Sequence, residues 1–590
     1  MTDPTVILDA FAPGRFGSSY RFSGLKETIR ALTPAEVLPA LERIEAAVAG
    51  GLHAAGYLAY EAATGLNPCL ATFSRSRTPL LWFGIFRERH QVPVTLPPPA
   101  PAHSYRVDRW RSSRSTEEYT DAVRRIRDYI AAGDTYQVNH TFRRRFRFSG
   151  DPLALYHDLC RSQQAPFCAY LAFDRTRILS ASPELFFSLD GDRLLVSPMK
   201  GTAGRGRWPA EDRDRIEALR QSPKDRAENL MIVDLLRNDL GMVAQTGSVH
   251  VDSLFDVSPL PTLLQMTSTV SARLRPGIGF TSLLQALFPC GSITGAPKRR
   301  TMELIRELER EPRGIYTGCI GYLSPGPEAL FSVAIRTLVL DLEAGRGELG
   351  VGSGVTYDST SVAEHAECLA KGRFATLRLP EFQLVETLLL DEDWFLPERH
   401  LARLAASAVY FGFAFPESHI RQRLEENRIG LFGRHKVRLL LSRDGSVTVE
   451  ASPLPPPDES VGTIRISRRR IDQDDPFLFH KTTHRPLYRA ELARNPGCTD
   501  VIFCNTRGEV CEGANHNIVA RIDGRLFTPP VASGLLAGTF RDELLEQGIL
   551  EERVLTPADL HQADDLFLIN SVRRWRRVRL ARPRTTSQRS

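Results

Sequence analysis

Apolar and polar residues alternate in short runs along the chain, and segments with helical spacing separate these runs. In the first half the pattern predicts strands at 56–60, 136–148, 316–323, 329–340 and 349–355. It predicts helices at 42–51, 116–132, 224–237, 297–309 and 361–376. In the second half it predicts a helix at 398–410 and strands at 386–390, 435–441, 447–451, 501–504, 517–522 and 566–570. Such a mixture predicts an α+β architecture.

Proline-rich stretches and a change of rhythm indicate where the chain divides. Leu96–Pro101 and Pro453–Asp458 are rich in proline, and Leu379–Glu381 separates two differently spaced series of elements. The end of the chain is rich in Arg, Ser and Thr, so we expect a frayed tail. We therefore expect five segments, with the bounds 1–95, 96–380, 381–456, 457–580 and 581–590.

The stretch Ser180–Thr202 carries the first candidate chemistry. Two apolar runs flank the turn signal Asp190-Gly191-Asp192, a pattern that predicts a β-hairpin. Because side chains alternate along strands, Glu184 and Lys200 are then expected on one face at the open end of the hairpin. The alternative is an edge hairpin whose Glu and Lys are merely solvated.

Carboxylates on two predicted helices form a candidate metal site. Glu364 and Glu367 are three residues apart and share a helix face, and Glu228 lies on another helix. Carboxylates from two helices can hold Mg²⁺, a hard cation that also binds substrate oxygens. The alternative is two solvated helix faces. The run 352–354 (GSG) follows a strand and could bind an anion through its backbone N–H groups.

Composition narrows the classes of partner. The 590 residues carry a formal charge of +6, which is mild for this length, so we expect no nucleic-acid partner. No apolar run is long enough for a membrane span, and the N-terminus has no signal-peptide pattern. Nine scattered cysteines without a C-x-x-C pair are typical of a reduced, cytoplasmic protein.

Eight motifs follow one another in the first 375 or so residues. They are GDTYQVN (133–139), SPE (182–184), PMKGT (198–202), ENLMIVD (228–234), RND (237–239), GSITGAPK (291–298), AIRT (334–337) and GSG (352–354). In content and order they resemble the chorismate-utilising enzymes, and most closely those of the aminodeoxychorismate synthase component I type.

The resemblance implies a role for each member of the hairpin pair. Lys200 would attack the chorismate ring at C2, Glu184 would protonate the departing C4 hydroxyl, and ammonia would then attack C4 and expel the lysine. Relatives of the anthranilate synthase type carry a small residue in place of Lys200. A lysine must be neutral to attack, and lowering its pKa from 10.4 to 7 costs about 4–5 kcal/mol, which burial or a nearby cation could supply.

The resemblance also implies the remaining site residues of the first half. The metal ligands would be Glu228 and Glu367, with Glu364 nearby. The substrate-binding residues would be Thr294, Arg336, Gly352, Ser353 and Gly354. Among these, Arg336 and the glycine-rich backbone would bind the enolpyruvyl carboxylate. One departure is Gln265, where the family often has a histidine; Gln cannot carry a proton, so we assign it no acid–base role.

The second half carries a different candidate constellation. Lys481 ends an apolar run and, taken alone, is typical of a strand end. Glu512 follows 31 residues later, and LLAGT (535–539) is a glycine-rich turn that could seat a phosphate. Together with HLARL (400–404), these motifs resemble the fold-type IV pyridoxal-phosphate enzymes over 382–578. The most similar type is 4-amino-4-deoxychorismate lyase, with branched-chain and D-amino-acid transaminases as relatives.

This second resemblance implies how pyridoxal 5'-phosphate would be held. Lys481 would be joined to the cofactor and would move the substrate proton, while Glu512 would pair with the pyridine nitrogen. The phosphate contacts would be Arg403, Gly538, Thr539 and Ser571. Two departures from the family are Arg574, where glycine is common, and the loop ANHN (514–517).

The two resemblances together imply a fold and a pathway. An anthranilate synthase component I-like chorismate-binding β-sandwich domain (lobe 1–95, catalytic domain 96–380) would precede a two-lobed fold-type IV domain (small lobe 381–456, large lobe 457–580). The first domain would convert chorismate to 4-amino-4-deoxychorismate. The second would eliminate pyruvate to give 4-aminobenzoate for folate biosynthesis.

The expected partners follow from what the motifs include. The sequence contains no glutaminase signature, so ammonia would come from a separate glutamine amidotransferase subunit. The second domain resembles proteins that form homodimers. Two alternatives stay open: the first half makes anthranilate or another chorismate product, and the second half is an amino-acid transaminase.

Overall fold

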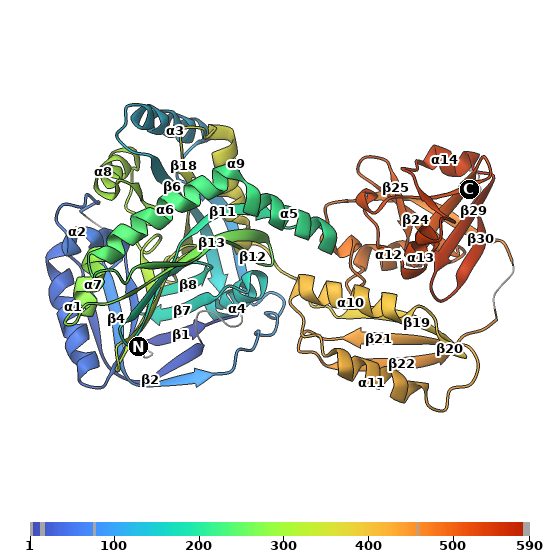
Figure 1. Ribbon diagram of the computed structural model, residues 1–590, viewed down its shortest axis with the longest axis horizontal. Helices are drawn as coiled ribbons and strands as arrows, with labels where there is room; N and C mark the ends of the chain where they lie inside the picture. The colour runs from blue at the N-terminus through green and yellow to red at the C-terminus, as the bar shows by residue number, and fades with distance from the viewer. Residues whose placement is uncertain (1–3, 12–17, 75–77, 457–459, 582–590) are drawn as a thin grey trace. The chain divides into compact units, whose positions relative to one another are not determined.

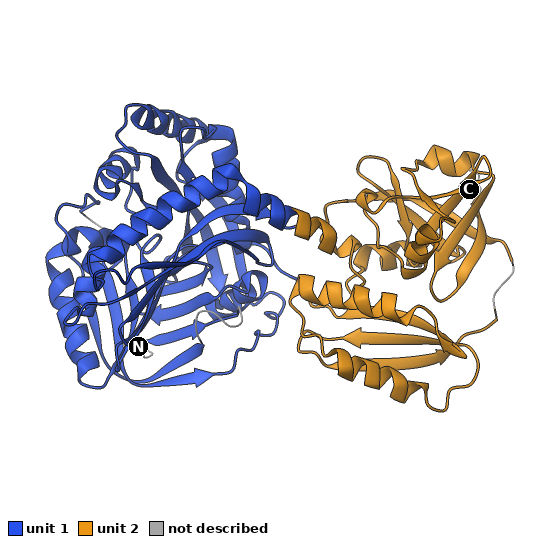
Figure 2. Cartoon of the chain, in the orientation of Figure 1, with its two compact units in different colours: residues 1–205, 215–379 blue, residues 206–214, 380–590 orange. Residues whose placement is uncertain are grey.

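The structure, a computed structural model, describes residues 4–11, 18–74, 78–456 and 460–581. The chain divides into two compact units, shown in two colours in Figure 2. Unit 1 comprises residues 1–205 and 215–379, and unit 2 comprises residues 206–214 and 380–590. Part of the expected linker at Pro453–Asp458 and all but the first residue of the expected tail lie outside the described residues. Within these ranges, no helix has the length and apolar character needed to cross a bilayer.

Unit 1 is built on strands that hydrogen-bond into one continuous antiparallel sheet, and the described part of the chain contributes 18 of them (Figure 1). They are β1 (Thr5–Asp9), β2 (Ser19–Ala31), β3 (His53–Leu58), β4 (Leu81–Val92), β5 (Tyr105–Ser112), β6 (Gln137–Gly150), β7 (Phe167–Phe173), β8 (Thr176–Ser182), β9 (Leu185–Asp190), β10 (Arg193–Ser197), β11 (Met199–Gly204), β12 (His250–Pro259), β13 (Leu263–Arg273), β14 (Gly295–Ala296), β15 (Cys319–Ser324), β16 (Glu328–Val333), β17 (Thr337–Asp341) and β18 (Arg346–Val355).

Helices pack on this sheet and close three buried apolar clusters. They are α1 (Pro34–Ala49), α2 (Ala63–Leu66), α3 (Thr116–Ala131), α4 (Pro152–Gln163), α6 (Pro223–Gly241), α7 (Phe280–Leu287), α8 (Lys298–Leu308) and α9 (Ser361–Lys371). A further helix, α5 (Pro209–Gln221), begins in unit 2 and ends in unit 1.

Local sequence explains where the helices near the site begin. The Ser115 hydroxyl accepts a hydrogen bond from the Glu118 N–H, and the Glu118 carboxylate accepts one from the Ser115 N–H, a capping box that starts α3. At α9 a single hydrogen bond caps the helix, from the Ala363 N–H to the Thr360 hydroxyl. These caps fix the first turns, so the residues that the helices present to the sheet are set by their sequence spacing.

The predicted hairpin forms, but its register differs from the expected one. β9 and β10 pair antiparallel around Gly191, as predicted. The pairing shifts at a bulge after Leu195, and the chain then leaves β9, so that β11 with Lys200 pairs with β13 instead. A single strand expected at 329–340 is two strands, because Arg336 adopts a left-handed φ of 49° between β16 and β17.

Unit 2 has two lobes, each with its own sheet. The first sheet has the strand order β20 (Asp393–Trp394), β19 (Leu384–Asp391), β21 (His435–Leu441), β22 (Val447–Pro453). Leu401 of α10 (Pro397–Phe411) and Leu424 of α11 (Glu417–Arg428) join one buried cluster with alternate residues of these strands. Because alternate residues face the same side of a sheet, both helices cover one face.

The second lobe carries a mixed sheet of eight strands among the described residues. They are β25 (Val510–Gly513), β24 (Asp500–Asn505), β23 (Gly462–Ile471), β30 (Arg574–Leu580), β29 (Asp565–Asn570), β26 (Asn517–Ile522), β27 (Arg525–Thr528) and β28 (Glu551–Glu552). Its helices are α12 (Pro486–Arg494), α13 (Thr539–Glu546) and α14 (Pro557–Gln562). Lys481 lies in the connection from β23 to α12, and its carbonyl accepts a hydrogen bond from the N–H of Val385 in the first lobe.

Candidate functional sites

Glu184 occupies a buried position just before β9. Its side chain is 3% exposed, and the Ser292 hydroxyl donates a hydrogen bond to Glu184 Oε1 at 2.6 Å. Burial raises the pKa of Glu184 to about 7, although Ser292 and Lys200 act in the opposite direction. At neutral pH this carboxyl group therefore exchanges readily between its protonated and ionised forms, as a general acid must.

Lys200 lies on β11, where its amine is surrounded by charged groups from three other segments. Burial lowers its pKa, and the Lys371 ammonium on α9 lowers it further. Glu228 on α6, Glu184 and Glu367 oppose this shift. Both means of keeping a lysine neutral that the sequence analysis considered, burial and a neighbouring cation, are therefore present at Lys200.

The Lys200 amine lies close against the backbone of Gly354. A Cβ atom added to Gly354 would come within 2.8 Å of Lys200 Nζ and 2.7 Å of Gln137 Nε2. Any side chain at position 354 would therefore displace the amine. Gln137 is fully buried, and neither of its amide atoms has a hydrogen-bond partner among the described residues. Gln137 is thus a polar group held beside Lys200 and available to it or to a substrate.

The three candidate metal ligands surround the same region. Burial raises the pKa of Glu228, and the like charge of Glu364 adds to the effect. Glu367 pairs with Lys371 at 2.6 Å, and Glu364 accepts a hydrogen bond from Ser359 at 2.7 Å. Within the described ranges, no three His, Cys, Asp or Glu side chains already form a metal site. The donor chemistry suits Mg²⁺, and Glu367 would exchange Lys371 for the ion.

Arg336 provides a positive charge without a compensating carboxylate. Its Nη1 donates to Gln163 Oε1 at 2.7 Å, and no described carboxylate pairs with it. Burial lowers its pKa to about 10, so the guanidinium remains charged at neutral pH. A partly buried, unpaired guanidinium favours a bound anion.

The break at Arg336 also exposes backbone groups of the neighbouring strand. β17 pairs with β18 only as far as Leu349, whereas β6 pairs with β18 up to Val355. Among the described strands, one edge of residues 350–355 therefore has no partner strand, and on this segment the Gly352 carbonyl accepts a hydrogen bond from Lys371 Nζ at 3.4 Å. Gly352, Ser353 and Gly354 lie within β18 and not after a strand, so the expected position of this run is wrong, and an anion site on its backbone stays a prediction.

Two predicted side chains point elsewhere. The Thr294 hydroxyl donates to the carbonyls of Cys290 and Gly291, at 3.2 and 3.1 Å, within its own turn. The Ser353 hydroxyl bonds to the Tyr119 hydroxyl at 2.9 Å under α3. Both hydroxyl groups therefore hold the protein together. The Thr294 backbone is engaged as well, because its N–H donates to the Gly291 carbonyl at 3.2 Å and its carbonyl accepts from the Asn139 N–H at 2.8 Å.

Sequence reasoning missed three groups of this site. Gln137 and Ser292 lie inside quoted motifs, but nothing in a single sequence shows which motif residues point inward. Lys371 follows Glu367 by four residues, and an i, i+4 Glu–Lys pair is a recognisable helix signal. Its proximity to Lys200 is a tertiary feature that this signal does not contain.

Lys481 is the candidate reactive amine of the second site. Burial lowers its pKa to about 8, an effect that Glu386 opposes and that Arg403, Arg485 and Arg438 reinforce. A lysine with this pKa has a substantial neutral fraction near physiological pH. The side chain is therefore suited to nucleophilic attack on a carbonyl group and to proton transfer.

Glu512 is held by a rigid set of partners on β25. The Tyr488 hydroxyl donates to Oε1 at 2.8 Å, and the Leu536 N–H donates to Oε2 at 3.2 Å. Burial raises the pKa of Glu512 to about 7, while Arg485, 3.8 Å away, favours the ionised form. A cationic ring nitrogen placed against it would favour that form further.

The glycine-rich turn of the expected phosphate seat lies at the start of α13. Gly538 precedes the helix without a side-chain cap, so the first N–H groups are free for an anion. Arg403 is bound to Glu386 by two hydrogen bonds of 2.8 Å and donates to the Ala537 carbonyl at 2.8 Å, which leaves two of its five N–H groups. Thr539 contacts His400 at 3.2 Å. These groups fit the phosphate of pyridoxal phosphate.

Other features of this site extend the sequence reasoning. Ser571 is buried, and its hydroxyl donates to the Thr387 carbonyl at 3.5 Å. Glu386, which orients Arg403 and His400, was not predicted; the residue is 1% exposed, and both of its carboxylate oxygens accept hydrogen bonds from these two side chains. Arg574, found where glycine is common, adopts a φ of 56°, and its guanidinium lies over the Phe395 ring. A left-handed backbone explains why glycine suits that position.

The unusual Gln265 lies on β13. Its side chain is 2% exposed, and neither of its amide atoms has a hydrogen-bond partner in the described part of the chain. It pairs across the sheet with Thr202, two residues after Lys200. The buried amide is therefore available for a hydrogen bond to a ligand.

Comparisons with known proteins agree with this division. The family model of chorismate binding enzymes matches residues 14–376, and that of amino-transferase class IV matches residues 383–581. Aminodeoxychorismate synthase component 1 of Klebsiella aerogenes is 45% identical over 264 residues, 44% of this chain and 58% of the relative. Anthranilate synthase component 1 of Aquifex aeolicus is 39% identical over 265 residues, 45% of this chain and 53% of the relative. The chain thus spans little more than half the length of these curated relatives.

The solved structures support the expected fold. Anthranilate synthase component I from Streptococcus pneumoniae aligns with a TM-score of 0.53 at 24% identity, covering 62% of this chain and 93% of that one. The expected α+β architecture, with a chorismate-binding domain followed by a class IV domain, is confirmed. The chain belongs to the chorismate binding enzymes and carries an amino-transferase class IV domain behind its chorismate-binding part.

Proposed function

We propose that the chain makes 4-aminobenzoate in two steps, amination of chorismate in unit 1 and elimination of pyruvate in unit 2. The observation that carries the first step is the pair of Lys200, an amine with a lowered pKa, and Glu184, a carboxyl group with a raised pKa. Two ionisable groups whose environments shift their pKa values in these directions suit a nucleophile and a general acid.

In the first step, Lys200 Nζ forms a bond to C2 of chorismate as the C4 hydroxyl leaves as water with a proton from Glu184. Ammonia then bonds to C4 and the C2–N bond breaks, which returns the Lys200 amine. Arg336 and the open edge of β18 would hold the enolpyruvyl carboxylate. Glu228 and Glu367, with Glu364 beside them, would hold Mg²⁺, which would neutralise the ring carboxylate. The net change is replacement of a hydroxyl by an amino group.

In the second step, Lys481 removes the C4 proton of 4-amino-4-deoxychorismate, and the enolpyruvyl group leaves as pyruvate. Bound pyridoxal phosphate would supply an electron sink for the charge that develops at C4. Arg403, Gly538, Thr539 and Ser571 would hold its phosphate, and Glu512 would pair with its ring nitrogen. Formation of an aromatic ring drives the elimination.

Partners complete the proposal. Ammonia would come from a separate glutamine amidotransferase subunit, and the class IV domain would form a homodimer in the cytoplasm. The main competing function is formation of anthranilate by unit 1, favoured by its likeness to an anthranilate synthase. Lys200 argues against that alternative, because anthranilate formation needs no amine at this position.

The test uses the purified chain with chorismate, Mg²⁺, pyridoxal phosphate and an ammonium salt. We expect 4-aminobenzoate and pyruvate in equal amounts, identified by chromatography and mass spectrometry. Anthranilate as the main product would contradict the proposal for unit 1. Rapid transamination of branched-chain or D-amino acids with 2-oxoglutarate would contradict it for unit 2.

A first prediction concerns the pH dependence of the C4 step. Glu184 must be protonated to act, so the single-turnover rate at a fixed concentration of free ammonia should fall as pH rises through about 7. The hydrogen bond from Ser292 stabilises the ionised carboxylate, so Ser292→Ala should raise the pKa of Glu184 and move this limb to higher pH. Ser248→Ala, which removes a hydroxyl bonded to the Gln245 carbonyl, is the control. An unmoved limb in Ser292→Ala would refute the assignment to Glu184.

A second prediction concerns the metal. Glu228→Gln keeps the size of the side chain but removes a charged oxygen ligand, so half-saturation of amination should need at least about tenfold more Mg²⁺. Asp234→Asn is the matched control on α6, because Asp234 is paired with Arg237 at the surface. Equal Mg²⁺ requirements in the two variants, measured by titration of the amination rate, would exclude Glu228 as a ligand.

A further inference from the structure

A short segment of the chain, Gly206–Asp214, belongs to unit 2 although the residues on both sides of it belong to unit 1 (Figure 2). The segment begins two residues after the end of β11 and contains the first turns of α5. It lies far in sequence from the rest of unit 2, which begins at Pro380. Unit 2, which contains the class IV domain, therefore also includes a segment far upstream of that domain. The sequence between the two is longer than half of the domain itself.

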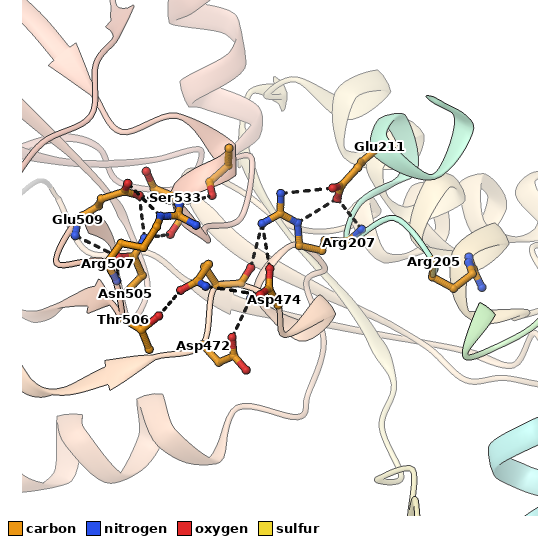
Figure 3. A network of polar contacts seen from close by, with 12 residues as sticks. Arg205, Arg207, Glu211, Asp472, Asp474, Asn505, Thr506, Arg507, Glu509 and Ser533 are labelled. Carbon is orange, nitrogen blue, oxygen red and sulfur yellow. Dashed lines mark hydrogen bonds and ion pairs between the residues drawn. The ribbon is translucent and has the colours of Figure 1, made fainter. Parts of the chain in front are cut away.

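Polar contacts anchor this segment. The Tyr410 hydroxyl on α10 donates to the Gly206 carbonyl at 2.8 Å. Arg207 donates to Asp474 at 3.3 Å and to the Gln473 carbonyl at 3.4 Å (Figure 3). Glu211 accepts from both the backbone and the side chain of Arg207, at 2.7 and 3.0 Å, and so holds the guanidinium in place. The segment is thus attached to both lobes of unit 2.

An apolar contact complements this network. The Trp208 ring lies 5.0 Å from the Phe479 ring, centroid to centroid, with the Arg207 guanidinium 4.7 Å from the Trp208 ring. Trp208 packs against a buried cluster that includes Phe479, Tyr488 and Cys511. Tyr488 donates to Glu512, and Cys511 precedes Glu512 in the chain. The cluster that Trp208 completes therefore supports the carboxylate of the second site.

The same segment supports the residues immediately before Lys481. Phe479, in contact with Trp208, is two positions away, and His480 is adjacent. The His480 ring lies 4.3 Å from the ring of Tyr410, whose hydroxyl holds Gly206, and its Nδ1 bonds to Ser407 at 2.9 Å. The backbone after Phe479 and His480 is held by the first lobe, where the Val385 N–H donates to the Lys481 carbonyl and the Thr483 N–H donates to the Gln383 carbonyl. Packing of Phe479 and His480 acts from the other side, so it contributes to the direction of the Lys481 side chain.

We propose that Trp208 is a positioning residue for Lys481, and that the segment Gly206–Asp214 supports the class IV active site. Trp208 acts through Phe479 and His480 and touches neither cofactor nor substrate. The proposal rests on the pyridoxal-phosphate site of the proposed function but not on which reaction that site performs. It deepens that function by making the second site dependent on residues of the chorismate-binding part of the sequence.

The experiment compares Trp208→Ala, Trp208→Leu and Trp208→Phe in the full chain loaded with pyridoxal phosphate. Three quantities are measured. They are the visible absorption band of the cofactor joined to Lys481, the pH midpoint of the titration of that band, and the rate at which the cofactor is transferred from Lys481 to a competing amine. We expect Trp208→Ala to release the cofactor about tenfold faster and to shift the midpoint, because small displacements of a reacting group have effects of this size or more. Trp208→Phe should restore both values, since it keeps an aromatic ring against Phe479.

Controls separate positioning from general destabilisation. Trp110→Ala removes a half-buried tryptophan from unit 1, where it packs on Phe146, and should leave the band and the release rate unchanged. Trp208→Leu keeps an apolar side chain of substantial volume, so this variant is expected to fold. Thermal denaturation checks the folding of each variant. An unchanged midpoint and release rate in both Trp208→Ala and Trp208→Leu would overturn the proposal.

The outcomes also distinguish this inference from the proposed function. A chain that binds the cofactor and responds to Trp208 substitutions, yet forms no 4-aminobenzoate, supports the positioning role and refutes the lyase reaction. A chain that forms 4-aminobenzoate with identical Trp208 variants refutes the positioning role alone. A wild-type chain that never joins the cofactor to Lys481 refutes both.

Discussion

Replacing Lys200 by methionine should lower the rate of chorismate amination at C4 by at least about 1,000-fold, because the variant keeps the length of the side chain but has no nucleophile. The structure strengthens this expectation. Burial and the Lys371 ammonium both lower the pKa of Lys200, so the neutral amine that must attack is already favoured before substrate binds. The measurement is the rate of 4-amino-4-deoxychorismate formation with Mg²⁺ and ammonium, followed by chromatography.

The control for this prediction is Lys26→Met, which alters an exposed lysine on β2 and should retain full activity. Mass spectrometry of the acid-quenched wild-type enzyme should also find chorismate-derived mass on the peptide that contains Lys200. Amination that persists in Lys200→Met at a tenth of the wild-type rate would show that ammonia attacks without a covalent lysine step. Anthranilate from the variant but not from the wild type would assign Lys200 a role in product choice only.

The lowered pKa of Lys200 also predicts the effect of replacing its neighbour Lys371. Lys371→Met removes a cation that lowers the pKa of Lys200 and leaves Glu367 without its partner. The acidic limb of the amination rate should then move to higher pH, because a more basic lysine stays protonated over a wider range. Lys371→Arg keeps the charge and should behave like the wild type. A pH profile of both variants checks this, and an acidic limb that moves to lower pH would contradict it.

Periodicity predicted the helices that carry the first site, because their ends are marked locally. The helix expected at 224–237 is α6, which Ser222 caps through the Asp225 N–H, and the one expected at 361–376 is α9, capped by Thr360. Capping and apolar spacing are properties of neighbouring residues, so a single sequence contains them. The candidate residues on these helices could therefore be placed on faces before the structure was known.

Strand register could not be predicted in the same way. The hairpin between β9 and β10 follows from its own turn, but the partner of Lys200 is β13, more than 60 residues further along the chain. A bulge after Leu195 redirects the strand, and the energy of pairing between distant segments decides which strand becomes the partner. The same limit hid the break at Arg336, because a left-handed φ at an arginine has no sequence signal. That break opens the edge of β18.

Groups that act through others were the hardest to predict. Glu386 orients Arg403 and His400, yet as a single glutamate in a strand it is indistinguishable from a solvated one. Trp208 lies between two motifs of the chorismate-binding part, and nothing nearby connects it with Lys481. Motifs indicate residues that contact ligands, whereas supporting residues are set by packing between distant segments.

Replacing Lys481 by alanine should abolish formation of 4-aminobenzoate and pyruvate, by at least about 1,000-fold, while amination of chorismate continues. The two expected effects differ because Lys481 serves the second step alone. The product of the first step should therefore accumulate in solution. Burial lowers the pKa of Lys481 to about 8, so the wild-type amine can both react with the cofactor carbonyl and accept the C4 proton near neutral pH. Chromatography of both products in one reaction measures the split.

Two comparisons make this result specific to the Lys481 amine. Lys436→Ala alters an exposed lysine on β21 of the same unit and should leave both steps intact. A small primary amine added to Lys481→Ala should restore part of the elimination, because it can supply the missing base without the side chain. If Lys481→Ala still forms 4-aminobenzoate at the wild-type rate, the elimination proceeds elsewhere. If Lys481→Ala also stops amination, the two steps do not depend on separate sets of residues.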